Sequence, residues 1–395
     1  MSIFKNKWLM LTPIIAFAVI FIFSLTIFPS VQPQPKNLPI AIVNEDQGIA
    51  LPNQSEMNMG QKIVETIQQS SNTATGEEPA VKWVEVKSVE EVQNGLDNQK
   101  YYAALIIPKD FSAKQASLQT AAPSSPEIQL LINQGMNTAA STMAGQMLNG
   151  VVDNLNNNAR TQILEGFQKQ GATLTVDQAS SLASPITKKV INVNEIGTKS
   201  ANGNAPVSLF QPVWMASLAS AAISFIAVQK RMIRNRKESL TTKLVQILMG
   251  AIVALVVGFG LTWLAEGMLG FHIPQFADTA LFLSITCFSF FLMILAVLSY
   301  LGMKGMPVFV LILFFGAPLL ALAPEMMSSF YRNWIYSWLP MRFMVGGLRE
   351  LFFFGQGLTW NIVSVLVGIG LVSILLVFVS SLRRISTQGQ TLQSK

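Results

Sequence analysis

Residues 244–264 read LVQILMGAIVALVVGFGLTWL, a run of 21 residues without a charged side chain. A helix rises about 1.5 Å per residue, so this run is long enough to cross the roughly 30 Å hydrocarbon core of a bilayer. A helix of this length on a soluble protein would carry a polar face. The run therefore predicts a membrane-spanning helix, and it decides the class of fold.

Further apolar runs of similar character occur along the chain. They cover residues 8–28, 207–228, 281–301, 307–323 and 362–382. The run 307–323 is short and would need local thinning of the bilayer or help from neighbouring helices. With 51% hydrophobic and 12% charged residues overall, the composition agrees with a membrane class. We expect a polytopic α-helical membrane protein with six transmembrane helices and an extracytoplasmic α/β domain between helices one and two.

This reading divides the chain into three parts. They are residues 1–30, the N-terminus and first helix; 31–205, the α/β domain; and 206–395, a five-helix domain with loop 229–243, segment 324–360 and a tail. The middle part carries apolar, strand-like segments separated by turn residues, which predicts a small sheet. These segments are Ile40–Val43, Val81–Val86, Tyr101–Ile107 and Glu127–Ile132. From about Asn137 to Phe167, apolar residues recur at three or four positions, which predicts one long amphipathic helix.

The net charge of +6 conceals two opposite regions. Residues 31–205 hold 12 Lys/Arg against 16 Asp/Glu, whereas the remainder holds 15 against 5. The basic residues outside the middle part lie beside apolar runs, which is typical of membrane topology and not of a nucleic-acid patch. Loop 265–279 has no Lys or Arg. The asymmetry places that loop and the α/β domain outside and both termini in the cytoplasm of a multi-pass protein of the cell membrane.

Few residues are available for catalysis or for holding a cofactor. The chain has one histidine, His272, and one cysteine, Cys287, which removes most metal sites and His-based triads. It has no phosphate-binding loop, no nucleophile elbow, no His-Glu-x-x-His and no EF-hand loop. We therefore expect no enzymatic activity, no cofactor and no metal, and any ATP-driven work would need a separate subunit.

The loop 229–243 is strongly basic and has a helical spacing. Its candidate docking residues are Arg231, Arg234, Arg236, Lys237 and Glu238. One interpretation is retention on the cytoplasmic side with contact to anionic lipid. The other is a docking helix for a cytoplasmic partner, and the two are compatible.

Segment 324–360 mixes aromatic residues with charges, among them Arg342, Arg349 and Glu350. It is too polar for a span and too apolar for an ordinary loop. It would be either an interfacial helix with snorkelling arginines or a re-entrant hairpin broken at Pro340 or Gly346-Gly347. In the second case the three charged residues would line a pathway for an amphiphile.

Two segments of the middle part resemble a known family. Ile40-Ala41-Ile42-Val43-Asn44-Glu45-Asp46-Gln47-Gly48 and Tyr101-Tyr102-Ala103-Ala104-Leu105-Ile106-Ile107-Pro108-Lys109-Asp110-Phe111-Ser112 are similar to the signature segments of the YhgE/Pip (phage infection protein) branch of type 2 ABC transporter permeases. Leu339-Pro340-Met341-Arg342-Phe343 and Gly347-Leu348-Arg349 resemble the segment before the last span of those permeases.

The resemblance implies a bacterial permease subunit that forms a homodimer or pairs with a related half. It would work with a separate cytoplasmic ATPase subunit and export a lipid-like or other amphiphilic substrate. Relatives in this branch also include phage receptors and a secretion-system component. The alternative is therefore a membrane-anchored receptor or assembly scaffold that acts through its ectodomain.

Overall fold

The structure is a computed structural model that separates into two compact units. It describes residues 13–14, 16–18, 20–21, 24–25, 34–50, 57–71, 78–171, 173–229 and 235–383. The α/β unit comprises Gln34–Glu195 and Ala323–Met327. The helical unit comprises Met1–Pro33, Ile196–Leu322 and Ser328–Lys395.

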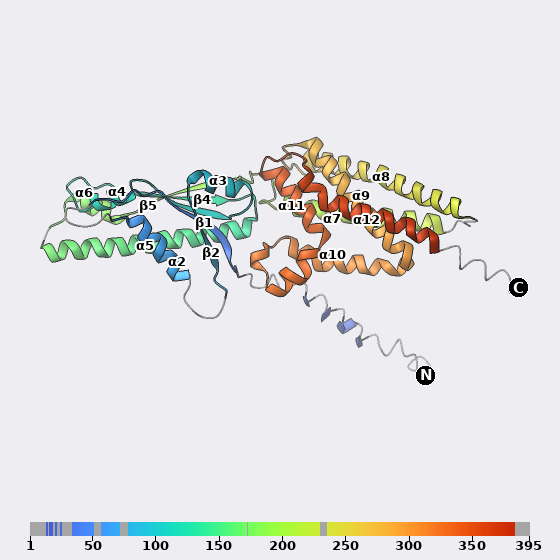
Figure 1. Cartoon of the computed structure of the whole chain (residues 1–395), viewed down its shortest axis with the longest axis horizontal. Helices are drawn as coiled ribbons and strands as arrows, with labels where there is room; N and C mark the ends of the chain where they lie inside the picture. Colours follow the sequence, from blue (N-terminus) through green and yellow to red (C-terminus); the bar gives the residue numbers. More distant parts are fainter. Residues whose placement is uncertain are drawn as a thin grey trace. The chain divides into compact units, whose positions relative to one another are not determined.

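A five-stranded mixed sheet forms the centre of the α/β unit, in the order β2-β1-β3-β4-β5 (Figure 1). The strands are β1 (Leu38–Asn44), β2 (Val81–Val86), β3 (Ala103–Ile107), β4 (Glu127–Asn133) and β5 (Thr187–Val193). Strand β1 pairs in parallel with both β2 and β3, β3 pairs antiparallel with β4, and β4 pairs in parallel with β5. The most apolar strands, β1 and β3, thus lie inside the sheet, where both faces are covered.

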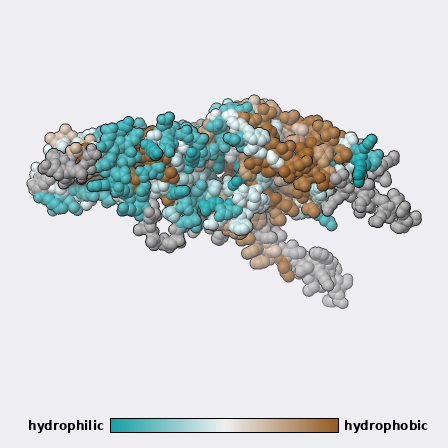
Figure 2. Space-filling view, viewed as in Figure 1, coloured by the Kyte–Doolittle hydropathy of each residue, from teal (hydrophilic) through white to brown (hydrophobic). Residues whose placement is uncertain are grey.

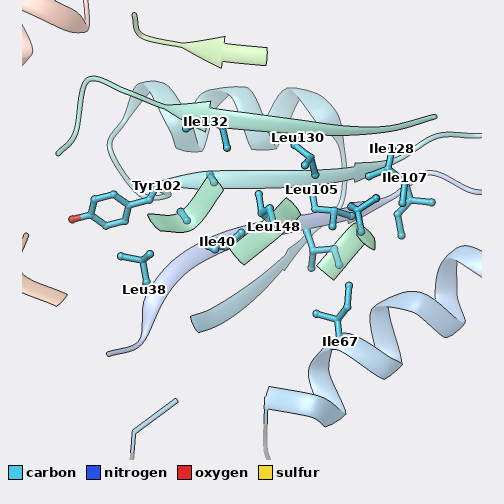
Figure 3. Close-up of a cluster of buried hydrophobic side chains, with 14 of the residues drawn as sticks. Leu38, Ile40, Ile67, Tyr102, Leu105, Ile107, Ile128, Leu130, Ile132 and Leu148 are labelled. Carbon is cyan, nitrogen blue, oxygen red and sulfur yellow. The ribbon is translucent and has the colours of Figure 1, made fainter. Parts of the chain in front are cut away.

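One face of the sheet packs against α2 (Met59–Ser71) and the 33-residue helix α5 (Thr138–Gln170). Figure 3 shows this core, in which alternate residues of the strands point at the two helices. Helix α5 presents small and branched side chains at a helical spacing, namely Ala140, Ala144, Leu148 and Val152. Asn137 begins the helix by accepting a hydrogen bond from Ala140 N at 3.1 Å, and Gly171 ends it with a φ of 62°.

The opposite face is covered by α3 (Val89–Asp97), whose Val92 and Leu96 contact Ala41, Val43 and Ile106 of the sheet. Ser88 begins α3 by accepting a hydrogen bond from Glu91 N at 3.2 Å. Two short helices, α4 (Phe111–Ser117) and α6 (Val176–Ala183), complete the unit. A small satellite core holds them near the far end of α5, and it consists of Leu118, Ile163, Leu182 and Phe167.

The two segments that carry the family resemblance meet at the carboxylate of Asp46, just after β1. Its oxygens accept hydrogen bonds from Gly60 N at 3.0 Å, Ser112 N at 2.9 Å and Gly48 N at 3.3 Å, and from the Ser112 hydroxyl. Asp46 is 7% exposed. A buried carboxylate needs such donors, and here they come from the starts of α2 and α4. Asp46 therefore fixes both helices to the end of β1.

Five residues from a distant part of the sequence belong to the α/β unit. This inserted segment, Ala323–Met327, follows α10 (Met306–Leu320) and precedes α11 (Pro340–Phe353). Its Met326 is buried in the sheet core. Glu325 accepts hydrogen bonds from the Tyr102 hydroxyl at 2.7 Å and, through its carbonyl oxygen, from Lys36 N at 2.8 Å. The α/β unit is thus closed by residues far outside its main sequence range.

The helical unit is built around α9 (Phe276–Leu301), in which 15 residues are buried. Its other long helices are α7 (Ala205–Gln229), α8 (Arg236–Gly267) and α12 (Trp360–Arg383). The outward surface of these helices is apolar, as the hydrophobic colouring of this unit in Figure 2 shows, whereas the α/β unit is mostly hydrophilic. Such a surface is stable in a lipid environment and unfavourable in water.

The prediction of six transmembrane helices is wrong. Among the described residues, four stretches are long and apolar enough to cross a membrane, and they are Ala205–Gln229, Arg236–Gly267, Phe276–Leu320 and Trp360–Ser381. The expected span 281–301 and residues 307–320 of the expected span 307–323 fall in one of these stretches, because a 3-10 turn, Gly302–Gly305, joins α9 directly to α10. Helix α10 has only 15 residues, below the roughly 17 to 25 needed to span. The expected span 8–28 lies largely outside the described residues.

The protein is therefore a large α/β unit combined with four candidate spans, and it is not a six-span helical bundle. The four apolar helices indicate association with a membrane.

Candidate functional site

A groove of about 360 Å³ lies between α7 and α8 in the helical unit. Its walls are mainly apolar, and its floor includes Phe291 of α9 and Gly250 of α8. A β-carbon added to Gly250 would lie 2.2 Å from Cε1 of Phe291, so only glycine lets this ring pack there. A volume of this size is in the range of small-ligand sites.

One amide gives the groove its polar chemistry. Gln246 of α8 is 3% exposed, and its Nε2 donates to Ser224 O of α7 at 3.0 Å and to Ser224 Oγ at 3.4 Å. Its Oε1 is buried and has no hydrogen-bond partner among the described residues. The amide therefore holds α7 and α8 together through its nitrogen, while its oxygen has no donor among the described residues. A buried acceptor of this kind is costly unless something donates to it.

One turn earlier on α8, Lys243 is 5% exposed, and its Nζ donates to Ser299 Oγ of α9 at 2.9 Å. A buried ammonium in an apolar helical unit is expensive and is retained only where it has polar partners. Ser299 also donates to Leu295 O at 2.8 Å. Lys243 thus joins α8 to the central helix just beside the groove.

The predicted basic loop is shorter than expected, because α8 begins at Arg236. Arg231 and Arg234 lie outside the described residues. Arg236, Lys237 and Glu238 form the first turn of α8 and are all exposed. Asn235 begins the helix by accepting a hydrogen bond from Glu238 N at 2.8 Å.

Of the two break points considered in segment 324–360, the chain is interrupted at Pro340, where α11 begins after the extended residue Leu339. Helix α11 then continues without a break through Gly346-Gly347. Arg342, Arg349 and Glu350 all lie on it and are half-buried. The Arg342 guanidinium lies 4.5 Å from the ring centroid of Phe343 and 5.4 Å from that of Tyr336. These distances are typical of cation–π contacts, so part of the charge of Arg342 is directed at neighbouring aromatic rings.

Helix α11 packs tightly against the rest of the helical unit. A β-carbon added to Gly347 would lie 2.5 Å from Phe282 of α9 and 2.6 Å from Ile362 of α12, whereas one added to Gly346 would contact nothing. The buried face of α11 includes Met344 and Leu348. With 14 residues, α11 is too short to span a bilayer.

Three tryptophan side chains in the segments next to α11 are exposed. Trp334, Trp338 and Trp360 are all more than half exposed. Large exposed indole rings are typical of the boundary between hydrocarbon and water.

Comparison with known proteins adds a family. A sequence model described as a protein of unknown function (DUF3533) matches residues 9–374, which is most of the chain. The chain belongs to the DUF3533 family. No curated protein and no solved structure matches the chain. The DUF3533 match covers both the α/β unit and the groove.

The structure brings together residues that lie apart in the sequence. Gln246 forms an interhelical hydrogen bond with Ser224, 22 residues earlier in the chain. Lys243 belongs to the basic loop 229–243 in the sequence, but in the structure it is buried against Ser299, 56 residues away. The one available signal was its position next to the apolar run. No sequence pattern predicts the groove, because residues of the same types occur in any apolar helix.

Proposed function

We propose that this DUF3533 protein is the permease subunit of an exporter that moves an amphiphilic, lipid-like substrate out of the cell. In this proposal it acts as a homodimer or with a related half, together with a cytoplasmic ATPase. The resemblance to YhgE/Pip permeases supports the partners, a bacterial cell membrane, an extracytoplasmic α/β unit and cytoplasmic termini.

The observation that carries the proposal is the continuity of α8. Its first turn presents Arg236, Lys237 and Glu238 to solvent, and Val245 begins the part of the same helix that lines the groove. Nine residues of helix span about 13 Å. A force applied by a partner at the first turn would therefore move the groove wall directly, since an uninterrupted helix is stiff. Arg231 and Arg234 belong to the proposed docking surface by sequence.

The groove suits one part of an amphiphile. Its lining is apolar apart from the Gln246 amide and the hydroxyls of Ser220 and Ser224, so it would hold an acyl or ring system and accept one hydrogen bond. Arg342, Arg349 and Glu350 are proposed to contact the polar head, for which a guanidinium is a strong donor.

A pair of tryptophan substitutions on α7 tests the proposal. Ala227 lines the groove, whereas Ala219 lies on the same helix outside it, and both are exposed. In a strain without the gene, untargeted lipid mass spectrometry should show an amphiphile that accumulates in the cell. Wild type and Ala219→Trp should restore its level, while Ala227→Trp at equal expression should not.

The same experiment separates transport from the receptor or scaffold function. If the α/β unit binds a partner and the helices only anchor it, loss of the gene causes no accumulation, or both tryptophan variants restore the level equally. Either result would remove the permease proposal.

A further inference from the structure

The α/β unit has a second cavity, also of about 360 Å³, between α2, α4 and α5. Its apolar part is formed by Ile63, Phe111, Leu155 and Ile186. Phe111 is 1% exposed and Ile186 is 2% exposed, so these side chains belong to the folded core and give the cavity a fixed wall. Such a wall can take the apolar body of a small molecule by excluding water from it.

Polar groups from all three helices surround this apolar wall. Lys62 and Thr66 come from α2, Gln115 from α4, and Asn158 and Gln162 from α5. Among the described residues, no acidic side chain lines the cavity, and Lys62 supplies its one formal charge. The rim is therefore electrostatically suited to an anion.

Gln115 adds a second, independent requirement. Its Oε1 is buried and has no hydrogen-bond partner among the described residues. An amide oxygen only accepts, so the missing partner must be a donor. Leaving such an atom unsatisfied is unfavourable, and a ligand with a hydroxyl or N–H group on its apolar body would satisfy it.

We propose that this cavity is a binding site for a small amphiphilic organic acid whose apolar body carries a hydrogen-bond donor. The apolar wall takes the body, Gln115 Oε1 accepts from the donor, and the Lys62 ammonium contacts the anionic group. The site lies wholly within the α/β unit. It does not depend on transport, and it remains testable if the permease proposal fails.

The probe is 6-hydroxy-2-naphthoate, which has fused apolar rings, a hydroxyl donor and a carboxylate. The control probe is 2-naphthoate, which lacks only the hydroxyl. Titration calorimetry on the full chain in nanodiscs, with empty nanodiscs subtracted, should show saturable binding of the hydroxylated acid. Its affinity should exceed that of 2-naphthoate by about 2- to 10-fold, the value of one hydrogen bond.

Two variants assign the binding to this cavity. Gln115→Leu should bring the ratio of the two affinities to about one, because the acceptor is gone while the apolar volume is kept. Lys62→Gln should weaken both probes about three- to tenfold and reduce the salt dependence, a modest effect because Lys62 is exposed. Lys100→Gln removes an exposed charge outside the cavity and should change neither affinity.

The proposal is overturned if the wild type shows no saturable binding of the hydroxylated acid. It is also overturned if Gln115→Leu keeps the full preference for the hydroxyl, or if Lys62→Gln and Lys100→Gln have equal effects. Circular dichroism of each variant, compared with the wild type, checks that the fold is retained.

Discussion

The substitution Asp46→Asn should destabilise the α/β unit although it changes the side chain very little in size. One carboxylate oxygen faces Ser112 N and Gly48 N, and the other faces Gly60 N and the Ser112 hydroxyl. Both oxygens therefore face a backbone N–H. In either orientation of the amide, its NH₂ group replaces an acceptor and points at a donor.

The magnitude follows from two contributions. Losing a hydrogen bond to a charged group costs about 1.5–3 kcal/mol, and leaving a buried N–H unsatisfied costs about 1–3 kcal/mol. Together they lower the free energy of unfolding by about 3–5 kcal/mol. The population of the locally open state would rise by between about 100-fold and a few thousandfold.

Hydrogen exchange followed by mass spectrometry on the full chain in nanodiscs measures this opening. Peptides from β1, β3 and the first turn of α2 should exchange faster by that factor in Asp46→Asn. Glu45→Gln is the matched control, since Glu45 is the neighbouring carboxylate and is half-buried. Equal exchange in the two variants would show that the Asp46 carboxylate does not hold the helices.

Three further outcomes are expected. Gly347→Ala should lower the midpoint of thermal unfolding in detergent, since its β-carbon would lie 2.5 Å from the Phe282 ring. Gly346→Ala should leave this midpoint unchanged or raise it. A lower midpoint for Gly346→Ala than for Gly347→Ala would contradict the packing of α11. In a cysteine-free background, Ala122→Cys should react with an impermeant thiol reagent on intact cells and Asn235→Cys should not, as the charge asymmetry predicts. Labelling of Asn235→Cys would show that the orientation is reversed. Lys243→Met should keep or raise the thermal midpoint, because a buried charge is replaced by an apolar chain of similar length, so a fall of several degrees would show that the ammonium is structurally required.

The sequence predicted those parts of the α/β unit whose residues alternate or recur clearly. Strands β1 to β4 and the long helix α5 lie where the apolar pattern placed them. Strand β5 was not predicted, because five of its seven residues are exposed and it includes Lys188 and Lys189, so its apolar side chains show no alternation. Its place in the sheet comes from parallel pairing with β4, a contact between residues about 60 positions apart.

The limits of a sequence pattern also explain the wrong number of predicted transmembrane helices. Hydropathy over a window detects the apolar run 307–323 but does not locate the end of a helix, and α10 ends at Leu320. The candidate sites could not be predicted from the sequence. Gln115, Lys62 and Leu155 belong to three helices that pack together only in the folded unit, so neither their spacing nor their types indicated a shared cavity.

The inserted segment limits how the α/β unit can be produced separately. A fragment consisting of residues 34–195 would lack Met326 from its core and would leave the Tyr102 hydroxyl without Glu325 as acceptor. Such a fragment would expose the apolar surface that Met326 covers, and it would therefore be prone to self-association. A soluble version of this unit therefore needs the five residues supplied as well, either as an added peptide or through a linker that returns them to the start of β1.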